Sequence, residues 1–205
     1  ADPLALARNP MLNLVILPAT EPDDTTYGTA PMHIEAYPEA TVHHIRFPKM
    51  VWYNETVCKE TIAQIEALGL SEIVLVGFSK SGLGAWHIAR AMPERVAGTI
   101  IFDSPVVRYQ LPPWGTEPFY ADDAAWQKDL PLHTIPAFQV AMPPTHPLIL
   151  ISGESFHAEM HIFSQALCKT NLEHIFLPRA KIKHHWNAGW LEEGLAEIRK
   201  SGVAP

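Results

Sequence analysis

One serine of the sequence stands in a setting that suits nucleophilic chemistry. Four apolar residues at positions 73–76 lead into the hexapeptide GFSKSG at positions 77–82, and a helical pattern follows at once. A serine on such a sharp strand-to-helix turn carries its hydroxyl clear of the backbone, and small residues two positions before and after it relieve the crowding of the turn. Here those small residues are Gly77 and Ser81. The pattern predicts a serine nucleophile at Ser79.

The helix that follows this turn strengthens the prediction. Its first N–H groups have no partner within the helix, and the positive end of its dipole favours developing negative charge. The alternative interpretation is structural: Ser79 and Ser81 would be capping residues of an ordinary helix behind a glycine-rich turn.

A serine hydroxyl is a weak nucleophile at neutral pH and needs a positioned base. The segment KHHWNAGW at positions 183–190 follows the last predicted strand and precedes a predicted closing helix. A histidine in that loop can reach back to the serine turn, so His184 and His185 are the candidate bases.

The remaining histidines suit that task less well, and we considered five of them. Two lie within a predicted strand, one lies on the helix after the serine turn, and two are spaced one helical turn apart: His43, His44, His87, His157 and His161. The last pair could bind a metal together, but no third ligand stands at a suitable spacing. We therefore predict neither a metal nor another cofactor.

Strands and helices alternate along the chain. Apolar runs predict strands over 11–18, 41–47, 73–76, 98–102, 146–152 and 174–177, and helical patterns cover 56–68, 81–92, 158–170 and 189–200. Such alternation implies parallel pairing through right-handed crossovers, hence an open α/β sheet of about six strands. Ligands of such sheets bind beyond the carboxyl ends of the strands, where every motif above falls.

The alternation breaks between the fourth and fifth strands. Residues 105–145 hold eight prolines and six aromatic side chains, Trp114 among them. A connection of this length is uncommon and usually has a function, so we expect a lid or a substrate wall over the active edge. The alternative is an excursion that only packs on the sheet.

The whole chain resembles a compact α/β-hydrolase of the serine esterase type. The segments VGFSKSGLGA at 76–85 and HHWNAGW at 184–190 are similar to a group of bacterial hydrolase-like proteins with a GFSKSG nucleophile elbow and an H-x-W-x-x-G-W closing motif. The resemblance implies that Ser79 is the nucleophile and His184 the base, with His185 as the alternative. It also implies that Trp186 and Trp190 line the pocket or pack the closing helix.

The acid of the triad departs from the common pattern of these hydrolases. Most place an aspartate after the fifth strand in a G-x-x-D loop, whereas this chain has Phe156 at that position and Glu154 two residues earlier. The other candidate is Asp103 at the end of the fourth strand, where some lipases carry their acid. We place Asp103 ahead of Glu154, and a water or a neutral group in place of the acid is the third alternative. For Asp103 the alternative role is that of a structural turn-forming aspartate before Pro105.

The resemblance also implies an oxyanion hole. One donor is the backbone N–H of Lys80, and the second comes from the loop after the first strand, at Ala19 or Thr20, because the proline before them has no N–H. We expect the Lys80 side chain to extend into solvent. Trp114, Phe156 and Trp186 are the expected substrate contacts.

The front of the usual fold has no counterpart here. Only two strands precede the serine strand, whereas the usual fold has four, so the chain is either a minimal six-stranded version or a fragment of a longer protein.

Bulk properties narrow the function further. The chain has 205 residues, 47% of them hydrophobic, which fits one domain, and a net charge of −7 argues against nucleic acid as a partner. No apolar stretch reaches transmembrane length. Cys58 and Cys168 are expected to be small buried residues rather than a disulfide, which leaves the compartment open with a lean to the cytoplasm.

The leading hypothesis is therefore a serine hydrolase that cleaves a small-molecule carboxylic ester, or a thioester or amide, through an acyl-enzyme. A hydrolase-fold protein that binds a ligand with little or no turnover is the alternative, since the acid departs from the common pattern. Fold alone does not decide between such functions.

Overall fold

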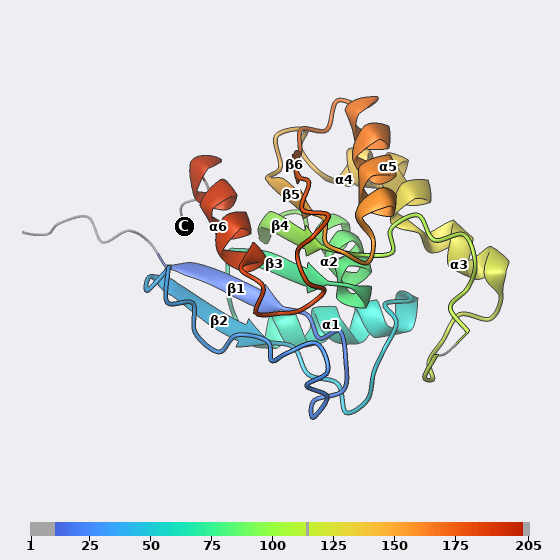
Figure 1. Cartoon of the computed structure of the whole chain (residues 1–205), viewed down its shortest axis with the longest axis horizontal. Coiled ribbons are helices and arrows are strands. Elements are labelled where there is room, and N and C mark those ends of the chain that lie inside the picture. The colour runs from blue at the N-terminus through green and yellow to red at the C-terminus, as the bar shows by residue number, and fades with distance from the viewer. Residues whose placement is uncertain (1–10, 114, 203–205) are drawn as a thin grey trace, which may run out of the picture.

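The computed structural model describes residues 11–113 and 115–202 and contains a parallel β-sheet (Figure 1). Its strands are β1 Leu12–Ile16, β2 Ala40–His44, β3 Ile73–Phe78, β4 Val96–Phe102, β5 Leu148–Ile151 and β6 Ile175–Leu177. The six strands pair in the order β2-β1-β3-β4-β5-β6, and each neighbouring pair is parallel. The predicted fold, a six-stranded parallel sheet flanked by helices, is confirmed.

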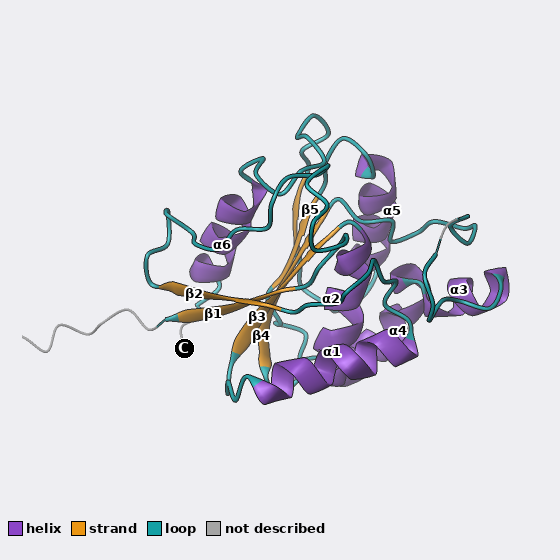
Figure 2. Cartoon of the chain, turned by 90° about the horizontal axis from the view of Figure 1, so that it is seen from below, coloured by secondary structure: helices purple, strands orange, loops and turns teal. Residues whose placement is uncertain are grey.

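The helices cover the two faces of the sheet unequally (Figure 2). One face carries α1 Glu55–Ala67, α2 Lys80–Ala91, α4 Ile135–Ala141 and α5 His157–Cys168, and the other carries α6 Trp190–Lys200. The strand order explains this arrangement. Every connection from β2 to β6 advances in one direction across the sheet, and right-handed crossovers place all such connections on one face. The chain reverses direction only between β1 and β2, so that loop lies on the other face with α6.

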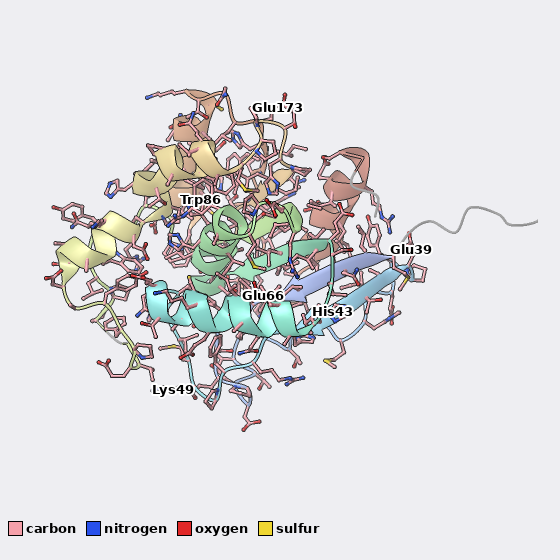
Figure 3. All side chains as sticks on the ribbon, turned by 180° about the vertical axis from the view of Figure 1, so that it is seen from behind. Glu39, His43, Lys49, Glu66, Trp86 and Glu173 are labelled. Atoms are coloured by element: carbon pink, nitrogen blue, oxygen red, sulfur yellow. The ribbon has the colours of Figure 1, made fainter. Side chains whose placement is uncertain are left out.

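Central strands read as continuous apolar runs because both of their faces are covered. All six residues of β3 are buried, as expected for a parallel strand between two layers. On the α2 side lies Trp86, which is labelled in Figure 3. Its ring stacks on Phe138 of α4 with ring centroids 3.9 Å apart. On the α6 side, Trp190 stacks on Phe102 at 4.5 Å. Two aromatic cores therefore fix the sheet between its layers.

Residues 105–145 contain secondary structure that the sequence analysis did not predict. Helix α3 Asp123–Asp129, a 3-10 turn at Pro131–Thr134 and α4 follow one another there. Trp126 of α3 and Phe138 of α4 are buried, so this part of the segment packs as a core element. Trp114 lies outside the described residues, and the lid stays a prediction.

Two smaller observations bear on the sequence analysis. Cys58 is partly buried and Cys168 is exposed, and both are free thiols. The expectation that Cys168 is buried was therefore wrong, because it lies on the outer side of the last turn of α5. Among the described helices, none combines the length and the apolar character that crossing a membrane requires.

Candidate active site

Ser79 lies on a strained turn between β3 and α2. Its φ of 54° and ψ of −121° are unusual for a residue with a side chain. A Cβ at Gly77 would lie 2.4 Å from the Ser81 carbonyl oxygen, so the turn requires glycine there. The Ser79 side chain makes no capping hydrogen bond. The Ser81 hydroxyl instead accepts from the Phe78 N–H at 2.8 Å and donates to its carbonyl at 3.0 Å.

Asp103 follows β4 directly and is fully buried. Its φ is 41°, and its carboxylate accepts hydrogen bonds from three backbone N–H groups of the loop after β5. Oδ1 accepts from Gly153 at 2.9 Å and from Phe156 at 2.8 Å, and Oδ2 accepts from Ser155 at 3.0 Å. The loop after β5, where the common pattern places an aspartate, thus supplies three N–H donors to the carboxylate of Asp103, which follows the neighbouring strand β4.

The fourth partner of Asp103 is an imidazole. His184 Nδ1 lies 2.7 Å from Asp103 Oδ2. Burial acts to raise the pKa of Asp103, but the hydrogen bonds from His184 and from the Phe156 and Ser155 amides outweigh it and hold that pKa below its ordinary value. Asp103 is therefore a carboxylate at neutral pH, which favours a proton on Nδ1 of His184 and leaves Nε2 as the basic nitrogen.

His184 is held from several further sides. Its backbone N–H donates to Glu154 Oε1 at 3.0 Å. Its ring packs against Phe78 at 4.6 Å between centroids, Tyr27 at 5.4 Å and Phe156 at 5.7 Å. The two candidate acids therefore contact the same histidine differently: Asp103 contacts its ring and Glu154 its backbone.

His185 points elsewhere. Its Nδ1 accepts from the Asn187 N–H at 3.1 Å, and its ring lies so close to Gly28 that a Cβ there would be 2.1 Å from its Cε1. The structure thus brings His184, and not His185, to Asp103.

A cavity of about 360 Å³ joins these groups at the carboxyl edge of the sheet. Ser79 and His184 both line it, as do residues of the loops after β1, β4 and β5. Among the described residues, no hydrogen bond joins the Ser79 hydroxyl to His184. The volume of the cavity is within the range of small-molecule sites. The described residues that line it are Ala19, Thr20, Thr26, Tyr27, Trp52, Phe78, Ser79, Lys80, Pro105, Arg108, Pro112, Glu154, Ser155, Phe156, Lys183 and His184.

Residues 52–166, more than half of the chain, match the family model "Esterase: Putative esterase". The chain belongs to this esterase family.

Solved structures agree with the fold of this esterase-family chain. FphF of Staphylococcus aureus, a fluorophosphonate-binding serine hydrolase, is similar with a TM-score of 0.61 and 12% identity, over 95% of this chain and 86% of that one. An S-formylglutathione hydrolase from Agrobacterium tumefaciens gives 0.64 and 16%, over 94% and 85%. The S-formylglutathione hydrolase FrmB of Staphylococcus aureus gives 0.59 and 13%, over 95% and 84%. Family and fold together support ester hydrolysis as the general class of reaction.

The other residues predicted to form the oxyanion hole or to contact substrate differ in where they lie. Ala19, Thr20 and Phe156 line the cavity as expected. Trp186 is absent from the described lining; it is buried, with its ring 4.9 Å from Phe78, and lines a neighbouring cavity of about 150 Å³. This placement corresponds to the packing alternative, because Trp186 also lies 5.8 Å from Trp190 of α6.

The side chain of Lys80 does not extend into solvent, and that expectation was wrong. Its Nζ lies 3.5 Å from the Ala19 carbonyl oxygen and 5.5 Å from the centre of the Trp52 ring. The aromatic ring attracts the cation over its face and keeps it against the cavity wall.

Several lining residues escaped the sequence analysis. Tyr27, Trp52 and Arg108 come from loops without a recognisable motif, and no sequence signal marks them. His157 and His161, considered as a metal pair, have ring centroids 6.5 Å apart, and His157 Nδ1 lies 2.8 Å from Ser152 Oγ. Across residues 11–113 and 115–202, no cluster of three or more His, Cys, Asp or Glu side chains is arranged to hold a metal ion.

Proposed function

We propose that the chain hydrolyses carboxylic esters through an acyl-enzyme formed on Ser79. The observation that carries this proposal is the contact of 2.7 Å between His184 Nδ1 and Asp103 Oδ2, in a cavity that Ser79 also lines. Asp103 serves as the acid of the triad, and Glu154 holds the backbone of the base.

Each group has a defined task in the proposed reaction. Nε2 of His184 takes the proton of the Ser79 hydroxyl as the oxygen attacks the ester carbonyl, and then gives it to the leaving alcohol. Asp103 fixes the tautomer of the ring and stabilises the imidazolium that forms. The hydrogen bond between serine and histidine is often long in a ligand-free site and tightens when substrate binds.

The tetrahedral oxyanion needs donors at the same place. The backbone N–H of Lys80, at the start of α2, is the proposed first donor, and the positive end of the α2 dipole acts in the same direction. The second donor is Ala19 or Thr20, since both line the cavity beside Ser79. Water attacks the acyl-enzyme by the same route and regenerates the serine.

The test uses Ser79→Ala, which removes only the nucleophilic oxygen. We expect hydrolysis of p-nitrophenyl acetate to fall by about 10⁴-fold or more, and covalent labelling by a fluorophosphonate probe to disappear. Ser71→Ala, at an exposed serine of the loop before β3, is the matched control and should label and turn over as the parent chain does.

Two results would contradict the proposal. Undiminished turnover in Ser79→Ala would remove that residue from the mechanism. A correctly folded parent chain that neither labels nor turns over would favour a ligand-binding protein built on this fold.

A further inference from the structure

Positive side chains gather around the candidate active site. Among the residues the structure describes, Lys80, Arg108 and Lys183 line the cavity, and Glu154 is the carboxylate that lines it with them. Asp103 lies behind the imidazole of His184, to which it is hydrogen-bonded. The chain as a whole carries a net charge of −7, whereas cationic side chains outnumber carboxylates among the described residues that line this cavity.

Lys80 directly follows Ser79 in sequence and lines the same cavity. Its Nζ lies 3.5 Å from the Ala19 carbonyl oxygen. Burial lowers the pKa of Lys80, while the carboxylate of Asp24 acts in the opposite direction. An ammonium has three N–H donors, and a carboxylate bound in the cavity would offset the cost of holding this charge in a half-buried position.

Arg108 and Lys183 stand on the loops after β4 and β6. The guanidinium of Arg108 lies 5.2 Å from the centre of the Phe156 ring, and its Nη2 is 3.8 Å from Glu159 Oε2. Lys183 is exposed and immediately precedes His184. Glu154, the carboxylate among the described lining residues, accepts the hydrogen bond from the His184 backbone at 3.0 Å. A guanidinium that is partly exposed is well suited to bind a carboxylate.

We propose that this site selects esters that carry a carboxylate group, which Lys80 binds with the help of Arg108 and Lys183. This inference rests on the proposed esterase function. The cations act at two stages: their field attracts an anionic substrate toward the cavity, and direct contact then orients its ester group at Ser79.

The test compares charged esters with neutral partners of nearly the same shape. Mono-p-nitrophenyl adipate and its methyl ester differ by a carboxylate on the acyl side, and 4-acetoxybenzoate and its methyl ester differ on the alcohol side. We expect kcat/KM for the charged member of one pair to exceed that of its methyl ester by about tenfold or more. The pair that shows this preference identifies the half of the ester that carries the anion.

Variants connect the preference to the named cations. In Lys80→Met the ratio of charged to neutral kcat/KM should fall by about tenfold, and added salt should lower the ratio in the parent chain because screening weakens exposed charges. Using the ratio removes any general effect of the substitution on turnover. Lys59→Met, at an exposed residue of α1 paired with Glu55 at 2.8 Å, should keep the parent ratio.

The inference is overturned if the parent chain hydrolyses both members of each pair equally well, or if neither Lys80→Met nor Arg108→Met lowers the ratio. If the chain does not hydrolyse esters at all, the proposed carboxylate site can still be tested, because binding is measured without turnover. Calorimetry on Ser79→Ala should then show tighter binding of the charged ester than of its methyl ester, and weaker binding of the charged ester when Lys80→Met is added. Equal binding of the two esters would also overturn the inference.

Discussion

Asp103→Asn replaces one oxygen of the buried carboxylate by an NH₂ group, which can donate but cannot accept. The carboxylate accepts from Gly153 and Phe156 on Oδ1 and from Ser155 and His184 on Oδ2. Whichever way the amide turns, its NH₂ faces at least one backbone N–H that loses its acceptor. With the NH₂ on the Oδ2 side, it faces both the Ser155 N–H and His184 Nδ1.

The size of the effect follows from these contacts. A buried backbone N–H without an acceptor costs about 1–3 kcal/mol of stability. The NH₂ takes the Oδ2 side, where it deprives one backbone N–H of its acceptor instead of two. There the amide donates to Nδ1 of His184, so the ring proton moves to Nε2, where it blocks acceptance of the Ser79 proton. The same exchange in a serine-protease triad costs about 10⁴-fold in kcat, which corresponds to about 5.4 kcal/mol in the barrier.

The assay is kcat on p-nitrophenyl acetate, with urea unfolding to separate lost stability from lost catalysis. Glu154→Gln is the matched control, since its amide oxygen can still accept from the His184 N–H, and we expect a loss of less than about tenfold. If Asp103→Asn keeps activity within tenfold of the parent chain while Glu154→Gln abolishes it, then Glu154 is the acid and the proposed role of Asp103 is refuted.

Two further predictions concern stability. Burial lowers the pKa of His146 from 6.5 to about 4, so between these pH values the unfolded chain binds more protons and the free energy of unfolding falls as the pH drops. Between pH 7 and pH 5 the free energy of unfolding should fall by ~2 kcal/mol because of this group. His146→Gln should reduce that pH dependence in urea titrations. An unchanged pH dependence would contradict the lowered pKa of His146. Phe138→Ala removes the buried ring stacked on Trp86 at 3.9 Å and should cost about 3–5 kcal/mol in urea unfolding. Val140→Ala, 90% exposed on the same helix, should change stability by less than about 0.5 kcal/mol, and equal losses in both variants would refute the packing argument.

The sheet could be predicted because its strands are buried on both faces. The apolar run at positions 73–76 predicts a buried strand, because a turn signal and a helical pattern follow it at once. The helices within residues 105–145 were not predicted, because proline is normally unfavourable within a helix. Pro131 and Pro136 instead lie in the first turns of the 3-10 helix and of α4, where proline is tolerated because its missing N–H has no helical partner.

For the proposed acid of the triad, the sequence leaves two candidates and does not choose between them. Asp103 and Glu154 both follow strands at the carboxyl edge, and their order along the chain fits either assignment. The decisive quantity is the direction in which each side chain points, which depends on loop conformation. Phe156 occupies the usual place of the acid, and its backbone N–H contributes to the site by donating to Asp103 at 2.8 Å.

Ser79 and Asp103 share a strained backbone conformation. Among the non-glycine residues of 11–113 and 115–202, these two have positive φ angles, 54° and 41°. Each directly follows one member of the registered pair Phe78 and Phe102 on β3 and β4. Such conformations cost about 1–3 kcal/mol each and persist only where surrounding contacts enforce them. The Ser79 N–H is held by the Phe102 carbonyl at 3.0 Å, and three backbone N–H groups hold the Asp103 carboxylate. Glycine would adopt both conformations without strain, so the presence of side chains at these positions supports the roles proposed for Ser79 and Asp103.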